Sequence, residues 1–271
     1  MSFSSWSSPN AIRNSSKSIG KRRSVCTFPT GKDTPACKAT PNKLLNQVRA
    51  IQNEILSNYA GDFSKHAPTQ EVPRIDMVWQ SILGQLSKEN KKFVYGVLKK
   101  GGRAKEFELA IQWLIDAGLI YKTTKVTKPE LPLKFYEDIS AFKLYLCDCG
   151  LMGAMANTDA KNVLISDTVF TEYKGAFTEQ YVLQQLLASN INNIYYYSSD
   201  TSRMEMDFII QQKGALVPIE VKGGTSIKAT SLHNYLKQHQ DIPAVRFSML
   251  PYRKQENITN MPLYGVFLSL E

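Results

Sequence analysis

The sequence lacks a long apolar run, and no stretch approaches the roughly 20 apolar residues that a membrane-spanning helix needs. It has only four cysteines, at positions 26, 37, 147 and 149. The last two are one residue apart, and no second Cys or His pair lies near them, which excludes zinc-site spacing. A chain of 271 residues without a secretory signal is also not expected to depend on disulfides. We therefore expect free thiols, a cytoplasmic location and no membrane partner.

Acidic residues are almost missing from the first 40 positions, where seven Lys or Arg residues face Asp33 alone, a net charge of +6. The whole chain carries +9, so the remaining 231 residues carry only +3. Residues 1–42 show neither helical nor strand periodicity, which predicts a disordered basic tail. Such a tail can bind nucleic acid non-specifically, and its Ser- and Arg-rich composition also resembles an organelle transit peptide.

Residues 43–134 are predicted to form a helical, winged-helix-like segment. The spacing of apolar residues predicts four helices, at 44–61, 75–86, 93–98 and 107–115. Gly118 is placed to end the last helix, and residues 119–126 are predicted to form a strand. In a winged-helix module, a helix enters a DNA groove beside basic residues, here Lys99, Lys100, Arg103 and Lys105. The alternative is that these residues form a solvated turn and that the module only packs against its neighbours.

Residues 135–271 are predicted to form a mixed α/β domain, because helical and strand patterns alternate along them. A turn is expected at 148–150. Helices are expected at 170–188 and 226–238. Strands are expected at 142–146, 193–198, 205–212, 215–222, 244–250 and 263–269.

The most informative stretch is the hairpin predicted around residues 213–214, a Lys-Gly pair suited to a two-residue turn. This turn pairs Gln212 with Ala215, and the same register places Asp207 directly opposite Glu220. Cross-strand partners share a face of the sheet, with Cβ atoms roughly 4.5–5.5 Å apart. The other face is expected to be buried and is made of six apolar residues: Met206, Phe208, Ile210, Val217, Ile219 and Val221.

Two neighbouring carboxylates repel each other unless a positive charge lies between them, and a divalent cation such as Mg²⁺ is a suitable one. Lys222 follows Glu220 by two residues and shares its face, where its ammonium could activate a water for attack on a phosphodiester. Glu179, on the preceding helix, could supply a third carboxylate. The predicted catalytic residues are Glu179, Asp207, Glu220 and Lys222, and the predicted metal ligands are Asp207, Glu220 and Glu179.

The same register allows an interpretation without a metal. Glu205 lies opposite Lys222 and could form an ordinary cross-strand salt bridge, with Asp207 and Glu220 facing water. Pro218 falls inside the second strand, where it cannot donate a ladder hydrogen bond, so an open or bulged position is expected there.

Several stretches together resemble one known family: DFSKHA (62–67), QLSKENKKFVYGVL (85–98), ELAIQWLIDAGLIYK (108–122), KLYLCDCGLMGAM (143–155), KGAFTEQYVLQQL (174–186), EMDFIIQ and VPIEVKGG. From about residue 43 onward, the sequence is similar to the C-terminal domain of unknown function found on predicted AAA+ ATPases of bacteria and archaea. The resemblance implies a winged-helix-like segment followed by a PD-(D/E)xK nuclease-like fold. On that pattern the four predicted catalytic residues occupy the nuclease-like positions.

The nucleotide-binding domain of such proteins is missing from this sequence. At Gly31-Lys32, a phosphate-binding loop would need glycine and Ser or Thr where this chain has Cys26 and Asp33. We therefore expect no ATP hydrolysis by this chain, although a separate ATPase or another protein could be a partner. The leading hypothesis is a nucleic-acid-associated protein with a divalent-metal nuclease-like site, active on DNA. The alternatives are a non-catalytic DNA- or protein-binding module derived from an AAA+ ATPase, and a gene product without a retained role.

Overall fold

The computed structural model describes residues 41–88, 90–158, 171–199, 204–224, 230–239 and 241–268. Nearly all of the predicted tail, and the start of the helix predicted at 226–238, lie outside these residues. The described residues form two compact units. One contains the described residues within 41–83, 94–121 and 150–158, and the other those within 84–93, 122–149 and 171–268.

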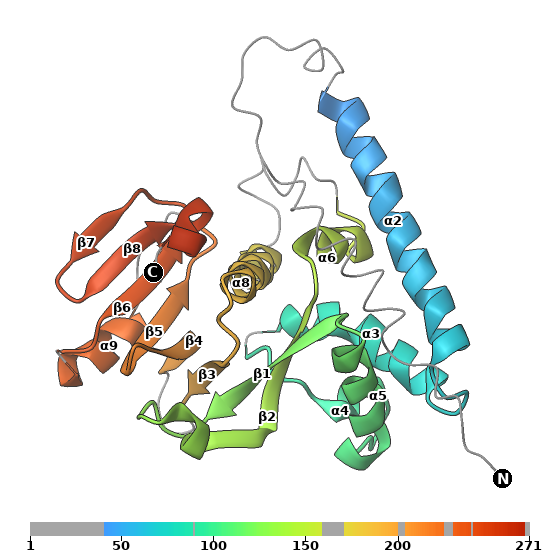
Figure 1. The fold of residues 1–271 in the computed structure, drawn as a ribbon, viewed down its shortest axis with the longest axis horizontal. Coiled ribbons are helices and arrows are strands. Elements are labelled where there is room, and N and C mark those ends of the chain that lie inside the picture. The colour runs from blue at the N-terminus through green and yellow to red at the C-terminus, as the bar shows by residue number, and fades with distance from the viewer. Residues whose placement is uncertain are drawn as a thin grey trace. The chain divides into compact units, whose positions relative to one another are not determined.

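The first unit is mainly helical (Figure 1). Its helices are α2 (Pro41–His66), α3 (Val72–Leu86), α4 (Tyr95–Leu98), α5 (Ala104–Asp116) and α6 (Cys149–Met155). The centre of its core is aromatic, because the ring of Phe63 meets Trp79 and Trp113 edge to face at centroid distances of 5.9 and 5.7 Å. Such pairs contribute about 0.5–1.5 kcal/mol each beyond the burial of their area. They join α2, α3 and α5, three of the four predicted helices.

Two helix boundaries differ from the prediction for identifiable reasons. Helix α2 continues past Gly61 to His66, since Phe63 extends its apolar stripe and is only 1% exposed. Helix α4 is a single turn, because the backbone is extended on both sides of it, at Val94 and at Lys99. Gly118 ends α5 as predicted, with a φ of +73° that favours glycine.

The second unit is built on an eight-stranded mixed sheet with the strand order β2-β1-β3-β4-β5-β6-β8-β7, which can be followed in Figure 1. The strands are β1 (Ile120–Val126), β2 (Glu137–Leu146), β3 (Ile194–Ser198), β4 (Glu205–Gln212), β5 (Ala215–Val221), β6 (Ala244–Ser248), β7 (Arg253–Gln255) and β8 (Ile258–Pro262). Neighbouring strands are antiparallel in the pairs β3–β4, β4–β5 and β7–β8, and parallel in β1–β3, β5–β6 and β6–β8. The predicted class, a helical N-terminal region followed by a mixed α/β sheet, is confirmed.

Two helices pack on this sheet. Helix α8 (Thr171–Ala188) packs against β5 and against the 3₁₀ segment η3 (Leu263–Leu268), and α9 (Thr230–Gln238) packs against β4. Leu232 and Leu236 of α9 share a hydrophobic cluster with Tyr195, Ile209 and Leu216 of the sheet. The shorter 3₁₀ segment η2 (Leu133–Tyr136) leads into β2.

The C-terminal part of the sheet departs most from the prediction. The strand predicted at 263–269 is the 3₁₀ segment η3, and two strands that had not been predicted, β7 and β8, precede it. Strand β7 has the sequence Arg-Lys-Gln and is largely exposed, so it lacks the apolar alternation by which a strand is identified. Strand β2 begins at Glu137 rather than at the predicted residue 142. Its first four residues are not buried, so they show no apolar alternation from which the strand could be predicted. Helix α6 forms where a turn was expected at 148–150.

Two of the four cysteines, Cys147 and Cys149, lie in the described part of the chain. Cys147 and Cys149 are free thiols, and burial, followed by the charge of Asp148, raises the pKa of Cys147 to about 12. A neutral thiol is a poor metal ligand at physiological pH. In the described part of the chain, every helix is too short or too polar to cross a membrane.

Candidate metal and phosphodiester site

The β4–β5 hairpin has the predicted register. Five residue pairs run from Gln212↔Ala215 at the turn to Phe208↔Ile219. The turn residues 213 and 214 have φ values of +50° and +79°, as a type I′ turn requires. The six apolar residues predicted to be buried on the hairpin are all at most 8% exposed.

Beyond the last of these pairs, the ladder opens at Asp207. The N–H of Val221 donates a hydrogen bond of 2.7 Å to Oδ2 of the Asp207 side chain. The predicted cross-strand pair of Asp207 and Glu220 is thus replaced by a side-chain bridge, although the two carboxyl groups remain close enough to perturb each other. The carboxyl group of Asp207 is therefore positioned by the backbone of the strand that carries Glu220.

The pairing of β4 with β3 has a β-bulge at the same point. Against β3, the register of β4 shifts between Tyr195 and Tyr197, so that two residues of β4, Asp207 and Phe208, lie opposite one residue of β3. Bulges of this kind redirect side chains and are frequent beside functional sites. Met206 consequently joins the hydrophobic cluster beneath α9, so its predicted alternation with Phe208 on a single face is wrong.

Pro218 occupies a regular position and not the open or bulged one that was expected. It pairs with Ile209 in the middle of the ladder. Residues of an antiparallel pair alternate between hydrogen-bonded and non-hydrogen-bonded positions. Because proline has no N–H, only the second kind of position can accept it, and the β4–β5 register provides one.

Glu179 reaches the same site from α8. It is only 3% exposed, and its Oε2 accepts a hydrogen bond of 3.3 Å from the hydroxyl of Tyr145 in β2. Its Oε1 forms an ion pair with the ammonium of Lys91. Asp207 also lies within side-chain hydrogen-bonding reach of Glu179. The structure therefore brings Glu179 and Asp207 together, as the sequence predicted.

Lys222 lies beside Glu220, with Nζ 2.5 Å from Oε1, and the two residues share a face as predicted. The metal-free interpretation had paired Lys222 with Glu205 instead. In the structure, the partner of Glu205 is the buried Lys143, at 3.3 Å, and the Lys143 ammonium also lies 4.7 Å from the ring centre of Tyr196. Lys222 is thus directed toward the carboxylate cluster.

The pKa values of this cluster move in opposite directions. Burial raises the pKa of Asp207 well above its usual value, and the carboxylates of Glu179 and Glu220 raise it further. Burial also raises the pKa of Glu220, although Lys222 opposes this. Burial acts to raise the pKa of Glu179 too, but neighbouring ammonium groups, Lys91 foremost, outweigh it and the pKa is lowered. A proton in this cluster therefore resides most readily on Asp207.

The fit to a metal ion rests on few ligands. Within the described ranges, no three acid, His or Cys side chains converge closely enough to hold a metal ion as they stand. Mg²⁺, however, is usually held by only one or two carboxylates together with water and substrate phosphates. Asp207 and Glu220 meet that smaller requirement, and both carboxylates carry a raised pKa that a cation would lower.

Besides Glu205, which only the metal-free interpretation had considered, three members of the cluster were not predicted as site residues. Lys91, Lys143 and Tyr145 come from a loop and a strand that precede α8 by many residues. Lys91 belongs to one of the stretches on which the family resemblance rests, but nothing local distinguishes it from Lys88 or Lys92. The alternation of Phe142, Leu144 and Leu146 would place Lys143 and Tyr145 on the opposite face of β2, without indicating what they contact.

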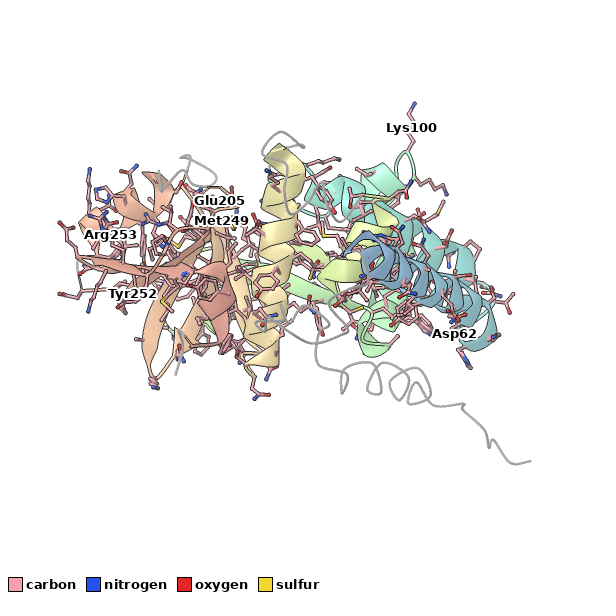
Figure 2. All side chains as sticks on the ribbon, turned by 90° about the horizontal axis from the view of Figure 1, so that it is seen from above. Asp62, Lys100, Glu205, Met249, Tyr252 and Arg253 are labelled. Carbon is pink, nitrogen blue, oxygen red and sulfur yellow. The ribbon has the colours of Figure 1, made fainter. Side chains whose placement is uncertain are left out.

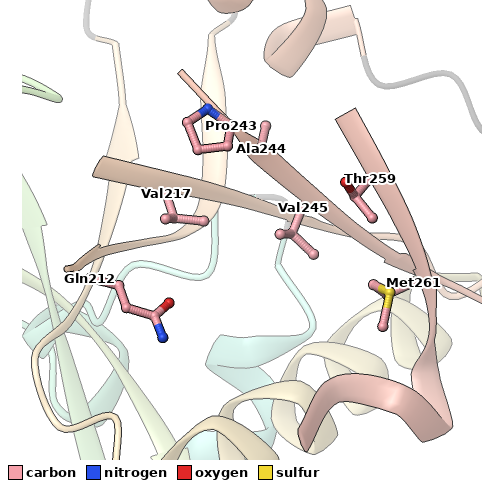
Figure 3. Close-up of a pocket in the computed structure, with 7 residues that line it drawn as sticks. All are labelled: Gln212, Val217, Pro243, Ala244, Val245, Thr259 and Met261. Atoms are coloured by element: carbon pink, nitrogen blue, oxygen red, sulfur yellow. The ribbon is translucent and has the colours of Figure 1, made fainter. Parts of the chain in front are cut away.

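A cavity elsewhere on the sheet has a different character (Figure 3). It measures about 250 Å³ and is lined by Gln212, Val217, Pro243, Ala244, Val245, Thr259 and Met261. These side chains offer an amide and a hydroxyl group but no acid, base or nucleophile. The carboxylate cluster is therefore the better candidate for a chemical function.

Comparison with known families divides the chain into two parts. Residues 35–162 match the family model described as Domain of unknown function (DUF8612). Residues 174–265 match the model described as Domain of unknown function (DUF4143), which is typical of AAA-associated proteins. The single family expected from residue 43 onward is thus replaced by two, and Glu179, Asp207, Glu220 and Lys222 all fall within the second. No curated protein and no solved structure matches the chain.

Proposed function

We propose that the second unit carries a divalent-metal nuclease-like site that cleaves a phosphodiester bond of nucleic acid, with DNA as the substrate. The observation that carries this proposal is the opening of the β4–β5 ladder at Asp207. Asp207, Glu220 and Lys222 from the hairpin and Glu179 from α8 come together there. Their order along the chain, Glu, Asp, then Glu-x-Lys, is the order expected of a PD-(D/E)xK site, and the mixed sheet with flanking helices supports that assignment.

In this proposal, Asp207 and Glu220 hold the metal ion, and Glu179 is the third ligand. A bound Mg²⁺ would polarise the phosphoryl group and lower the pKa of a coordinated water. Four acids, Glu179, Asp207, Glu205 and Glu220, share the cluster with three lysines, Lys91, Lys143 and Lys222. With every group ionised, one negative charge is left over, and the group that resists ionisation most is Asp207, so a bound metal ion would displace a proton from it.

Lys222 acts on the water and on the phosphate. Its ammonium is held 2.5 Å from Glu220, so it is positioned without being removed from solvent, since 32% of its side chain stays exposed. A positioned ammonium can orient an attacking water and stabilise the negative charge that develops on the phosphate oxygens. Burial acts to lower its pKa, but the neighbouring carboxylates, Glu220 foremost, outweigh burial and the pKa is raised, so Lys222 remains a cation throughout the neutral range.

DNA binding by the first unit is a second part of the proposal. The basic residues near α4 and α5 that were assigned to a winged-helix-like segment are all exposed: Lys99, Lys100, Arg103 and Lys105. Figure 2 shows Lys100 extending away from the ribbon. Exposed basic side chains can contact phosphates without reading the sequence. The proposal also includes a partner for this chain, either a separate ATPase or another protein.

A specific observation also supports the non-catalytic alternative. Two of the three predicted metal ligands, Glu179 and Glu220, already form ion pairs with lysines. A site balanced in this way could be a structural network in a DNA- or protein-binding module.

A cleavage assay separates the two functions. The purified chain is incubated with plasmid and single-stranded DNA in Mg²⁺, Mn²⁺ or EDTA, and Lys222→Met is compared with Lys237→Met, a change at an exposed lysine of α9. We expect metal-dependent cleavage that falls at least about 100-fold in Lys222→Met, the usual loss for a group that stabilises charge in the transition state, and is unchanged in Lys237→Met. Equal, metal-independent or absent cleavage in all three proteins contradicts the proposed reaction.

A further inference from the structure

Lys91 has an unusual setting for a lysine in a loop. Its side chain is only 15% exposed, and that of its ion-pair partner Glu179 only 4%. Its backbone φ is +49°, in the left-handed region that non-glycine residues seldom adopt. Such conformations persist where the surroundings enforce them and are frequent at functional sites.

The loop that carries Lys91 is fixed on both sides. Before it, the N–H of Lys91 donates to the carbonyl of Lys88 at 3.2 Å, which closes a turn. After it, Phe93 donates its N–H to the carbonyl of Phe142 at 2.8 Å and stacks on the Phe142 ring at 5.4 Å. The ammonium of Lys91 is therefore delivered to the carboxylate cluster by anchored backbone.

Both oxygens of Glu179 are engaged in this arrangement. Oε2 accepts from Tyr145, and Oε1 contacts Lys91. A carboxylate can keep a neutral donor such as the Tyr145 hydroxyl while it binds a metal ion. The Lys91 ammonium and a metal ion are both cations, however, and they compete for Oε1 of Glu179. Tyr145 is completely buried in β2, whereas Lys91 is partly exposed at the end of a flexible side chain. Lys91 is thus the contact that can leave.

We propose that Lys91 is the phosphate-binding cation of the site, held on Glu179 until a metal ion takes that carboxylate. This inference rests on the proposed metal site. A displaced ammonium would remain close by, because its backbone is anchored through Phe93. A partly buried charge without a partner destabilises the folded protein, so the ammonium needs another anion. The phosphate of a bound nucleic acid strand supplies it, since lysine binds phosphate as a point charge.

Two measurements on the full chain test whether Lys91 moves from Glu179 to a phosphate when a metal ion binds. The first is the affinity for Mn²⁺ alone, by calorimetry. The second is the affinity for a duplex oligonucleotide, with and without Ca²⁺ as a metal chosen not to support cleavage. Lys91→Met is compared with Lys92→Met, which removes one charge from the same loop at an exposed position, and with Lys91→Arg, which retains the charge.

We expect Lys91→Met to bind Mn²⁺ about tenfold more tightly than the unchanged chain, because an ammonium no longer competes for Glu179 and desolvated charge pairs couple at least this strongly. Ca²⁺ should increase the DNA affinity of this variant about tenfold less than it increases that of the unchanged chain. Lys92→Met and Lys91→Arg should change each affinity less than threefold. Lys91→Arg also guards against misfolding as an explanation, because it keeps the ion pair.

The remaining outcomes are decisive as well. If Lys91→Met binds Mn²⁺ no more tightly than the unchanged chain, Lys91 does not compete for Glu179 and the inference fails while the metal site stands. If it binds Mn²⁺ more tightly but keeps the full Ca²⁺-dependent DNA affinity, Lys91 does not contact phosphate and the inference also fails. If none of the four proteins binds Mn²⁺, the proposed metal site itself is wrong, and the inference is refuted with it.

Discussion

Replacing Asp207 by asparagine removes the carboxylate whose ionisation the fold resists most. The amide keeps an oxygen that can accept the N–H of Val221, so the contact that holds the two strands at the open end of the ladder is preserved. What disappears is the repulsion from Glu179 and Glu220 and the cost of burying a charge. We therefore expect Asp207→Asn to stabilise the metal-free protein at neutral pH.

The size and sign of this effect follow from the pKa. Each unit by which burial and neighbouring carboxylates raise the pKa of Asp207 costs the folded state about 1.4 kcal/mol once the group is ionised. Below an ordinary aspartate pKa of about 3.9, Asp207 is protonated in both the folded and unfolded states, and the cost vanishes. It grows as pH rises and is complete above the folded pKa. A pKa raised by one unit therefore lowers the melting temperature by about 3 °C for a chain of this size.

Thermal unfolding in EDTA at pH 4 and pH 8 provides the test. Asp207→Asn should melt at least about 3 °C above the unchanged chain at pH 8 and within 1 °C of it at pH 4. Mn²⁺ should raise the melting temperature of the unchanged chain, because a ligand at 100 times its Kd adds about 2.7 kcal/mol to the free energy of unfolding. It should leave the melting temperature of the variant unchanged. A variant that is destabilised at pH 8 and less so at pH 4 would refute the reasoning, because Asp207 would then be stabilising as a charged group.

Three further predictions concern the surroundings of the site. Glu205→Gln should cost about 1–3 kcal/mol in urea unfolding, since it leaves the buried Lys143 without its carboxylate partner, and an unchanged midpoint would show that the ring of Tyr196 suffices for this ammonium. Gly214→Ala should cost about 1–2 kcal/mol because φ is +79° there, and no loss of stability would mean that the hairpin turn relaxes. Deleting residues 1–40, which carry +6 of the +9 net charge, should weaken DNA binding and flatten its salt dependence by about 0.9 for each lost phosphate contact. An unchanged slope would instead place the binding surface at Lys99 and its basic neighbours.

The hairpin could be predicted from sequence because its determinants are local. The Lys-Gly pair at 213–214 fixes a two-residue turn, and the turn fixes every later pair up to Phe208↔Ile219. Glu179 was expected on the helix predicted at 170–188, which forms as α8 (Thr171–Ala188). These inferences need only the spacing of apolar residues and the type of turn, and a few neighbouring residues determine both.

The remaining features depend on contacts between distant segments. The bulge at Asp207 is a property of the pairing with β3, not of β4 alone, so alternation within β4 misplaced Met206. Lys91 enters the site because Phe93 binds to β2, and a loop of three lysines does not show which one is held there. The polar strand β7 forms at the edge of the sheet by pairing with β8, which its own sequence does not indicate.

The central claim is that Asp207 and Glu220 bind a divalent metal ion where the β4–β5 ladder opens. The most direct test is a crystal of the chain soaked in Mn²⁺ and measured near the manganese absorption edge. The account predicts one anomalous peak about 2.0–2.3 Å from carboxylate oxygens of both residues, and its loss in Asp207→Asn. A well-ordered site without anomalous signal at Mn²⁺ concentrations well above the millimolar range, with Lys222 still paired to Glu220, would contradict it.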